Sequence, residues 1–118
     1  TIELVITEPE FGLHPDLQSK LCSFICDIIK LKEENKSKVN IIIETHSTII
    51  IDTLRLEIVK RTITPDSCQL YYFDKIEGAT EIRKITVDKD GMLSDRFGDG
   101  FLDMSNSLLE ERLKVKLN

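Results

Sequence analysis

The chain has 118 residues, of which 41% are apolar and 31% are charged, and its formal net charge is -5. This length supports one domain with one core, and the apolar content is too high for a disordered chain. The acidic balance argues against a generally basic nucleic-acid-binding face, although it leaves room for a local basic patch.

Two further features bear on where the protein works. The sequence has no apolar run long enough to cross a bilayer, so no membrane partner is expected. It has three cysteines, an odd number, and no signal-peptide pattern, which favours a reducing interior over a disulfide framework. We therefore expect the protein in the cytoplasm.

The first part of the chain predicts a strand, a helix and a second strand. The nearly continuous apolar run from Ile2 to Thr7 is typical of a parallel strand covered on both faces, so the sheet should extend beyond it. Pro15 and Asp16 suit a first helical turn, and apolar residues at helical spacing, facing the sheet, continue to about Leu31. Val39 to Glu44 is the second strand. This order favours a right-handed parallel crossover.

A second helix and a hairpin are predicted next. Ser47 can cap a helix that runs from Thr48 to about Arg61. Cys68 to Phe73 and Glu81 to Val87 are expected to be strands joined around Glu77-Gly78. The hairpin is thus appended to the α/β unit.

The rest of the chain predicts a turn and a tail. Asp90-Gly91 is a turn signal, residues 98–100 interrupt the pattern, and Leu108 to Leu117 is an amphipathic, helical tail. The fold class is therefore α/β in a single domain. Residues 1–62 form its α/β lobe, and residues 63–118 form the hairpin and the C-terminal tail.

Polar side chains follow both strands of the predicted parallel pair. The first strand runs into Thr7 to Glu10 and the second into Glu44 to Ser47, so both segments should emerge on one rim of the sheet, where open α/β sheets bind ligands. A carboxylate such as Glu8 or Glu10 can hold a water and accept its proton, and the imidazole of His46 can hydrogen-bond a developing negative charge. Such a pair suits hydrolysis of a phosphoanhydride.

Taken singly, the same residues have simpler explanations. Glu8 or Glu10 can be an exposed loop carboxylate that serves solubility. His46 can be a surface histidine or part of a helix start. The functional interpretation therefore depends on these side chains lying together.

A metal site is a further alternative. Cys22 and Cys26 lie four residues apart on one helical face and could bind a metal with His14 or His46. Thiols in an apolar helix are more often core residues, and His14 is better explained as a loop residue beside Pro15. Stoichiometric zinc in the purified chain would support the metal site.

Two linked segments resemble a known family. IELVITEPEFGLHPDLQSKL followed by VNIIIETHSTIIIDTL is similar to the C-terminal lobe of an ABC-type ATPase head. The branch concerned includes the OLD-family (overcoming lysogenization defect) proteins and related predicted AAA-type ATPases of bacterial defence systems. In that family an apolar strand ends in an acidic pair followed by Pro-Glu, Leu-His-Pro opens a helix, and a second strand ends in Thr-His-Ser. The resemblance covers roughly Ile2 to Leu54.

This resemblance implies a P-loop NTPase fold that uses ATP and Mg²⁺. Glu8 falls on the catalytic glutamate that positions the attacking water, and His46 falls on the switch histidine that senses the γ-phosphate. Gly12, Leu13 and His14 fall on the loop that touches the opposite subunit, which implies a homodimer or a second ATPase subunit.

One position departs from the family pattern. Thr7 stands where the family has an acidic residue that reaches Mg²⁺, and a hydroxyl is a poorer ligand for a hard cation than a carboxylate. Weaker metal binding or turnover is therefore implied. Glu10 and Ser47, in the same two motifs, are the other candidate site residues.

The phosphate-binding half of such an ATPase is not in this sequence. No segment matches G-x-x-x-x-G-K-[ST], the loop that cradles nucleotide phosphates, and the ABC signature is also absent. We expect that half upstream, so the chain should be the C-terminal part of a larger ATPase and inactive alone.

The resemblance also bears on the cellular role. It implies DNA maintenance or anti-phage defence with a nuclease partner and DNA. Asp90 to Leu93 and Gly100 to Asp103 resemble a tail in a subset of these predicted ATPases, which argues against the OLD proteins themselves, where a Toprim nuclease domain would follow. The alternative is a non-enzymatic interaction module, a degenerate ATPase remnant in which Cys68 to Asp103 recruits a partner.

Overall fold

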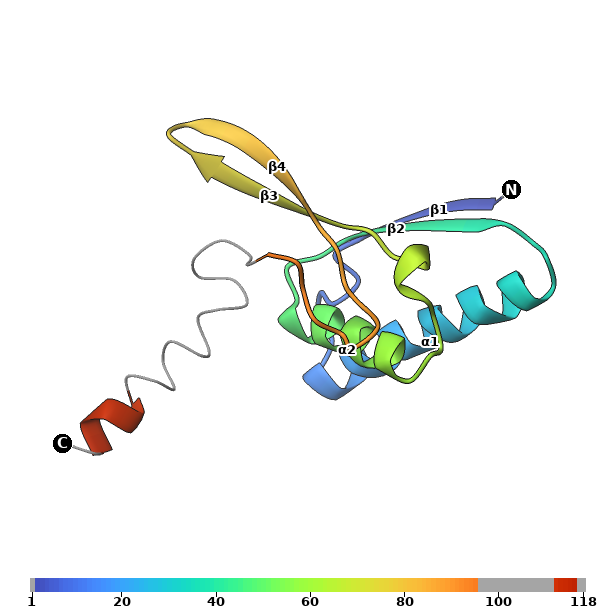
Figure 1. Cartoon of the computed structure of the whole chain (residues 1–118), viewed down its shortest axis with the longest axis horizontal. Helices are drawn as coiled ribbons and strands as arrows, with labels where there is room; N and C mark the ends of the chain where they lie inside the picture. Colours follow the sequence, from blue (N-terminus) through green and yellow to red (C-terminus); the bar gives the residue numbers. More distant parts are fainter. Residues whose placement is uncertain (1, 96–111, 117–118) are drawn as a thin grey trace.

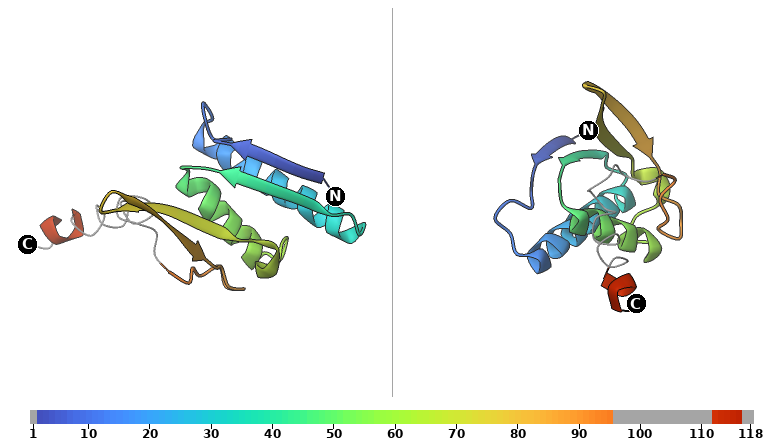
Figure 2. Two further views of the ribbon diagram at one scale, coloured as in Figure 1. Left: turned by 90° about the horizontal axis from the view of Figure 1, so that it is seen from above. Right: turned by 90° about the vertical axis from the view of Figure 1, so that its left-hand side faces the viewer.

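A computed structural model describes residues 2–95 and 112–116 and has a mixed α/β fold. Its elements are β1 (Ile2–Thr7), α1 (Pro15–Glu34), β2 (Val39–Glu44), α2 (Thr48–Val59), the short 3-10 helix η1 (Pro65–Ser67), β3 (Leu70–Ile76) and β4 (Ala79–Ile85). Both α1 and α2 lie on one side of the strands (Figures 1 and 2). Within the described residues, no helix is long and apolar enough to span a membrane.

The predicted parallel pair is confirmed. β1 and β2 are hydrogen-bonded neighbours, with Leu4 opposite Ile41 and Thr7 opposite Glu44. Because α1 connects their opposite ends, the carboxyl ends of both strands lie at the same edge of the sheet. This edge, with the loops that follow the two strands, is called the rim below.

The boundaries of α1 differ from the prediction at one end only. Pro15 occupies the first turn, where its missing N–H costs nothing, as predicted. The helix ends at Glu34, three residues beyond the predicted end at Leu31. The apolar spacing ends at Leu31, but lysine and glutamate are strong helix formers and continue the helix until Asn35 caps it.

Only one face of the parallel sheet is covered. Val5 and Ile42 are neighbours on the face away from α1, and they are 66% and 62% exposed. The prediction that β1 is covered on both faces is therefore not met within the described residues. Among these residues β1 pairs only with β2, so the other edge of β1 is open.

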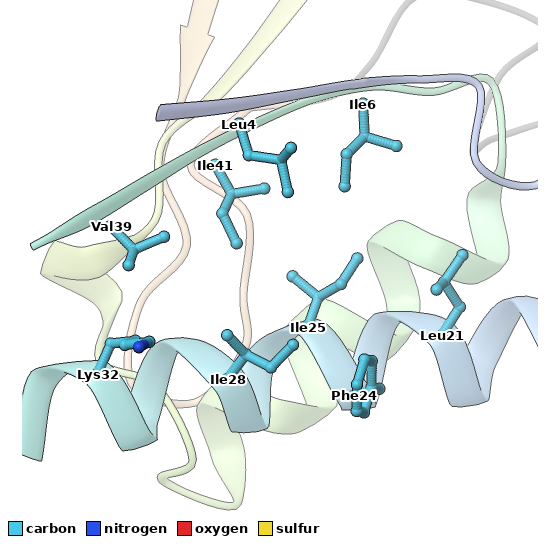
Figure 3. A pocket seen from close by; sticks show the side chains of 9 residues that line it. All are labelled: Leu4, Ile6, Leu21, Phe24, Ile25, Ile28, Lys32, Val39 and Ile41. Atoms are coloured by element: carbon cyan, nitrogen blue, oxygen red, sulfur yellow. The ribbon is translucent and has the colours of Figure 1, made fainter. Parts of the chain in front are cut away.

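A cavity of about 360 Å³ separates the sheet from α1. Figure 3 shows Leu4, Ile6, Val39 and Ile41 pointing from the strands toward the helix. The lining is completed from α1 by Leu21, Phe24, Ile25, Ile28 and Lys32. The apolar face of α1 does point at the sheet, as predicted, but it does not close against it.

The main core lies instead between the two helices and the segment after the hairpin. Its buried members are Cys22, Cys26, Ile50, Ile58, Ile63 and Val87. Cys22 and Cys26 are 4% and 1% exposed, which confirms the interpretation of these thiols as core residues. The hydroxyl of Ser23 donates to the buried carboxylate of Glu57 at 3.0 Å and so links α1 to α2.

α2 is shorter than predicted. It ends at Val59 rather than near Arg61, because Arg61 adopts a left-handed conformation with φ 66° that cannot continue a helix.

The predicted Asp90-Gly91 turn packs on α2. Arg55 Nε donates to the Gly91 carbonyl at 2.7 Å, and a Cβ at Gly91 would lie 3.2 Å from the Arg55 carbonyl oxygen.

The predicted hairpin is confirmed with shifted strand ends. β3 and β4 pair antiparallel as far as Ile76 opposite Ala79, so the turn needs only Glu77 and Gly78. Both turn residues have positive φ, 51° and 81°, as a type I′ turn requires. The predicted strands, Cys68 to Phe73 and Glu81 to Val87, were wrong by two or three residues. Both were placed too far from the turn, because the prediction left too long a loop between them.

The hairpin also has two unlike faces. On one face, Ile85 and Ile51 of α2 form a small buried cluster, and Leu70 and Tyr72 pack against it. On the other face, Tyr71, Phe73 and Ile82 are 52%, 64% and 60% exposed.

Of the predicted tail, residues 112–116 are helical. The expected interruption at residues 98–100 and the rest of the tail helix lie outside the described residues.

Candidate functional site

The rim is held together from its first residue. The backbone N–H of Glu8 donates to the carbonyl of Glu44 at 2.7 Å, which continues the pairing of β1 and β2 past Thr7. The loop after β1 and the loop after β2 therefore start side by side, as the parallel prediction requires.

Glu8 and His46 meet across this rim. His46 Nε2 lies 3.2 Å from Glu8 Oε1, and the two side chains are 75% and 44% exposed. The sequence predicted that these residues would converge, and they do. Since both remain open to solvent, the pair can present an acceptor and a donor to a bound molecule.

Glu8 has an uncommon backbone conformation. Its φ is 47°, in the left-handed region that non-glycine residues seldom adopt. Two hydrogen bonds fix it: its N–H to Glu44 and its carbonyl, which accepts from the N–H of Phe11 at 3.1 Å. Residues held in such conformations cluster at functional sites, and here the conformation turns the chain out of the strand directly at the candidate carboxylate.

The loop that the resemblance assigns to subunit contact is a compact turn with an exposed tip. The Leu13 N–H donates to the Glu10 carbonyl at 2.9 Å, and Gly12 has φ 75°. Phe11, at the tip, is 86% exposed. His14 is the N-cap of α1, where its Nδ1 accepts from the N–H of Asp16 at 3.3 Å. His14 thus has a structural role in the described chain.

Glu10 is not a free loop carboxylate. Its Oε1 accepts from the Thr45 hydroxyl at 2.6 Å, and its Oε2 accepts from the His46 N–H at 2.9 Å. Partial burial would raise the pKa of Glu10, but the hydrogen bonds from Thr45 and the His46 backbone outweigh it and lower the pKa below its usual value. Glu10 is therefore not explained as an exposed carboxylate that serves solubility. Its ionised carboxylate links the loop after β1 to the loop after β2.

Ser47 ties the rim to both helices. Its hydroxyl accepts from the Ile50 N–H at 3.2 Å, which confirms the predicted cap of α2, and donates to Gln18 Oε1 at 2.6 Å. The Gln18 amide in turn donates to the Leu13 carbonyl at 3.0 Å. Sequence reasoning missed Gln18, because α1 carries other polar residues near its start, such as Ser19 and Lys20, and nothing in the sequence sets Gln18 apart.

The structure does not bring the proposed zinc ligands together. His14 caps α1, His46 contacts Glu8, and Cys22 and Cys26 lie in the core. Contact with Cys26 lowers the pKa of the Cys22 thiol, whereas contact with Cys22 and burial raise the pKa of the Cys26 thiol. A protonated thiol is a poor ligand, so Cys26 does not suit a metal site. Among residues 2–95 and 112–116 no three His, Cys, Asp or Glu side chains could hold a metal ion.

The same observation bears on Mg²⁺. Thr7 and Glu44 are exposed partners at the ends of the strands, and the Glu8 carboxylate contacts His46. These groups do not form a set of oxygen ligands for a hard cation. The described residues therefore do not fit Mg²⁺ by themselves.

Comparison with known protein families matches part of the chain. A model of the family described as "Protein of unknown function (DUF3696)" matches residues 63–111, less than half of the chain. The matched part includes the hairpin and the Asp90-Gly91 turn but not the rim. No match was found among curated proteins or among solved structures.

Proposed function

We propose that this chain is the C-terminal lobe of an ATP-hydrolysing, ABC-type ATPase head with a P-loop NTPase fold, similar to OLD-like ATPases. The observation that carries the proposal is the contact of Glu8 with His46 on the carboxyl rim of adjacent parallel strands. The sequence resemblance over residues 2–54 assigns catalytic roles to these same two positions. The open edge of β1 and the exposed Val5 and Ile42 support further layers of such a fold.

In this proposal Glu8 acts as the general base. Its carboxylate is half-exposed on the rim, where it can hold a water molecule and accept its proton as the water attacks the γ-phosphate. The left-handed backbone at Glu8 turns the chain out of β1 at this point. The side chain therefore projects where ligands of open α/β sheets bind.

His46 would bind the phosphate. Its Nε2 faces Glu8, and an N–H at this atom can also donate to a phosphate oxygen. Nucleotide entry would thus exchange a carboxylate acceptor for a phosphate acceptor. That exchange frees Glu8 for the water and stabilises negative charge that develops on the phosphate.

Both cofactors depend on groups outside this sequence. The sequence lacks the phosphate loop whose backbone N–H groups and lysine cradle ATP, so that loop must be supplied by another segment. Mg²⁺ neutralises phosphate charge when it is bound in such sites. Because Thr7 and its neighbours do not fit the ion alone, we assign it no protein ligand here.

The proposed partner is a second ATPase head, of this protein or of another subunit. The support is the loop from Phe11 to His14, whose aromatic tip is 86% exposed beside the rim. We further propose a role in DNA maintenance or anti-phage defence with a nuclease partner, which rests on the resemblance. A cytoplasmic location is supported by three free cysteines, two of them buried.

The test is ATP turnover by the complete ATPase that contains this lobe. Glu8→Gln keeps the shape of the side chain but removes the base, so turnover should fall by on the order of 10² to 10⁴ while nucleotide binding is spared. The matched control is Glu3→Gln, an exposed glutamate on β1, the strand that leads to Glu8, and it should change neither. Unchanged turnover in Glu8→Gln would refute the assignment.

A second candidate is a non-enzymatic interaction module. The observation that favours it is the exposed face of the hairpin, with Tyr71, Phe73 and Ile82, within the segment that matches the uncharacterised family. In that case Glu8→Gln would leave every activity intact, and deletion of residues 68–103 would abolish complex formation.

A further inference from the structure

Hydrogen bonds join the two loops of the rim into a closed ring. It runs from the Glu10 carboxylate to the Thr45 hydroxyl, from there to the Ser47 N–H, and from the Ser47 hydroxyl to Gln18. The Gln18 amide donates to the Leu13 carbonyl, and the Leu13 N–H returns to the carbonyl of Glu10. The ring spans the loop after β1, the loop after β2 and the first turn of α1.

From this ring we infer that Glu10 is the positioning residue of the rim: its carboxylate holds the His46 backbone opposite Glu8 and couples His46 to the loop from Phe11 to His14. This inference rests on the proposed function for its catalytic meaning. Glu10 contacts neither reacting group with its side chain in the described structure, so it acts through His46.

The carboxylate is chemically suited to this task. Its two oxygens face two donors, the Thr45 hydroxyl at 2.6 Å and the His46 N–H at 2.9 Å. An ionised carboxylate accepts both bonds, and charge-assisted bonds are the stronger kind. A glutamine has one acceptor oxygen and no charge, so with Oε1 on the His46 N–H that bond is no longer charge-assisted and the Thr45 hydroxyl loses its acceptor.

The ring also explains how a subunit contact would reach His46. Glu10 belongs to the same tight turn as Gly12 and Leu13, and the Leu13 N–H and carbonyl are both members of the ring. A displacement of this exposed turn by a partner therefore moves an anchor of the His46 backbone. The chain of contacts is continuous and includes no side chain of the apolar core.

The first test is amide hydrogen exchange by NMR on the 118-residue chain without nucleotide. Glu10→Gln should accelerate exchange of the His46 N–H by about 10-fold to 100-fold, as expected for loss of a hydrogen bond to a charged group. Amides in the middle of α2 should keep their wild-type rates. Glu3→Gln, the matched control, should leave His46 unchanged.

A second variant covers the case in which Glu10→Gln does not fold. Thr45→Val removes the hydroxyl between Glu10 and the Ser47 N–H but keeps the volume of the side chain, and it should accelerate His46 exchange in the same direction. Wild-type exchange at His46 in whichever variant folds would overturn the inference.

The catalytic consequence is tested in the complete ATPase by a double-mutant cycle. Glu10→Gln should lower kcat about 10-fold to 100-fold with little change in KM for ATP, and Glu10→Asp should recover part of the loss. In a His46→Ala background, Glu10→Gln should cost less than about twofold, because coupled residues are not additive. Equal losses in both backgrounds would show that Glu10 does not act through His46.

These measurements separate the two proposals. If Glu8→Gln leaves turnover unchanged while Glu10→Gln accelerates His46 exchange, the ATPase assignment fails and the positioning of His46 stands. If Glu8→Gln removes turnover while His46 exchange is unaffected by Glu10→Gln, the ATPase assignment stands and the role of Glu10 is refuted.

Discussion

The rim and the outer face of the strands are built in opposite ways. On the rim, polar groups from residues far apart in sequence, such as Glu10 and Thr45, satisfy one another at short distances. The open faces of the two sheets carry Val5 and Ile42 on β1 and β2 and Phe73 on β3, and these side chains are 62% to 66% exposed. The described residues therefore fix the rim among themselves but leave apolar side chains of both sheets exposed.

This difference shows which properties are local to the chain. A hydrogen-bonded ring needs only its own members, so Glu10, Thr45 and Ser47 can hold the His46 backbone in place without the second lobe that the proposed function requires. An apolar sheet face gains stability only when something covers it, since the gain scales with the area removed from water. Stability measurements on the two faces of the hairpin and a pH titration of the rim test this difference.

The largest effect is expected for a side chain on the covered face of the hairpin. Ile85 is fully buried, at 0% exposure, against Ile51 and Leu93. Ile85→Ala removes this packing and leaves a cavity, so the free energy of unfolding should fall by about 2 to 5 kcal/mol. Denaturant unfolding followed by circular dichroism measures it.

Ile82→Ala is the matched control on the open face of the same strand. Ile82 is 60% exposed, and exposed substitutions change stability by less than about 0.5 kcal/mol. An equal loss of stability in the two variants would mean that the open face of the hairpin is already covered in solution. The two faces would then not differ as described.

A smaller effect is expected at the rim when pH is lowered. The pKa of Glu10 lies below its usual value of 4.5, so the folded rim favours the ionised form. Its contribution is therefore present in full above about pH 4.5 and is lost as pH falls through the lower folded pKa. Exchange protection of the His46 N–H, corrected for the intrinsic rate, should fall in that range.

Glu57 provides a reason to measure the rim locally. Burial would raise its pKa, but hydrogen bonds from Thr62 and Ser23, with the charge of Lys60, lower it, so global stability has the same pH dependence. Glu10→Gln should abolish the acid-dependent loss at His46 and leave the global loss in place. A His46 titration that persists in Glu10→Gln would assign it to another group.

Much of the fold could be predicted because its signals are local. The apolar run of β1, Pro15 at the start of α1, Ser47 before α2 and the Glu77-Gly78 turn each determine the backbone near themselves. The limits of elements were less predictable. Neither the charged last turn of α1 nor the left-handed Arg61 has a breaker such as proline to mark it.

The candidate site divides in the same way. Glu8 and His46 could be placed together from sequence, because both follow strands that were predicted to be parallel neighbours. The ring through Glu10 and Gln18 could not, because it depends on how two loops fold and on a side-chain orientation one turn into α1. Hydrogen bonds between loops have no sequence period to reveal them.

The most direct measurement of the central claim is a crystal structure of the complete ATPase with ADP and a metal-fluoride mimic of the transferred phosphoryl group. We expect the Glu8 carboxylate about 3 Å from the attacking water and His46 Nε2 donating to the mimic, as a general base and a charge-stabilising donor must. Nucleotide bound away from the rim, with Glu8 and His46 still in mutual contact, would contradict it.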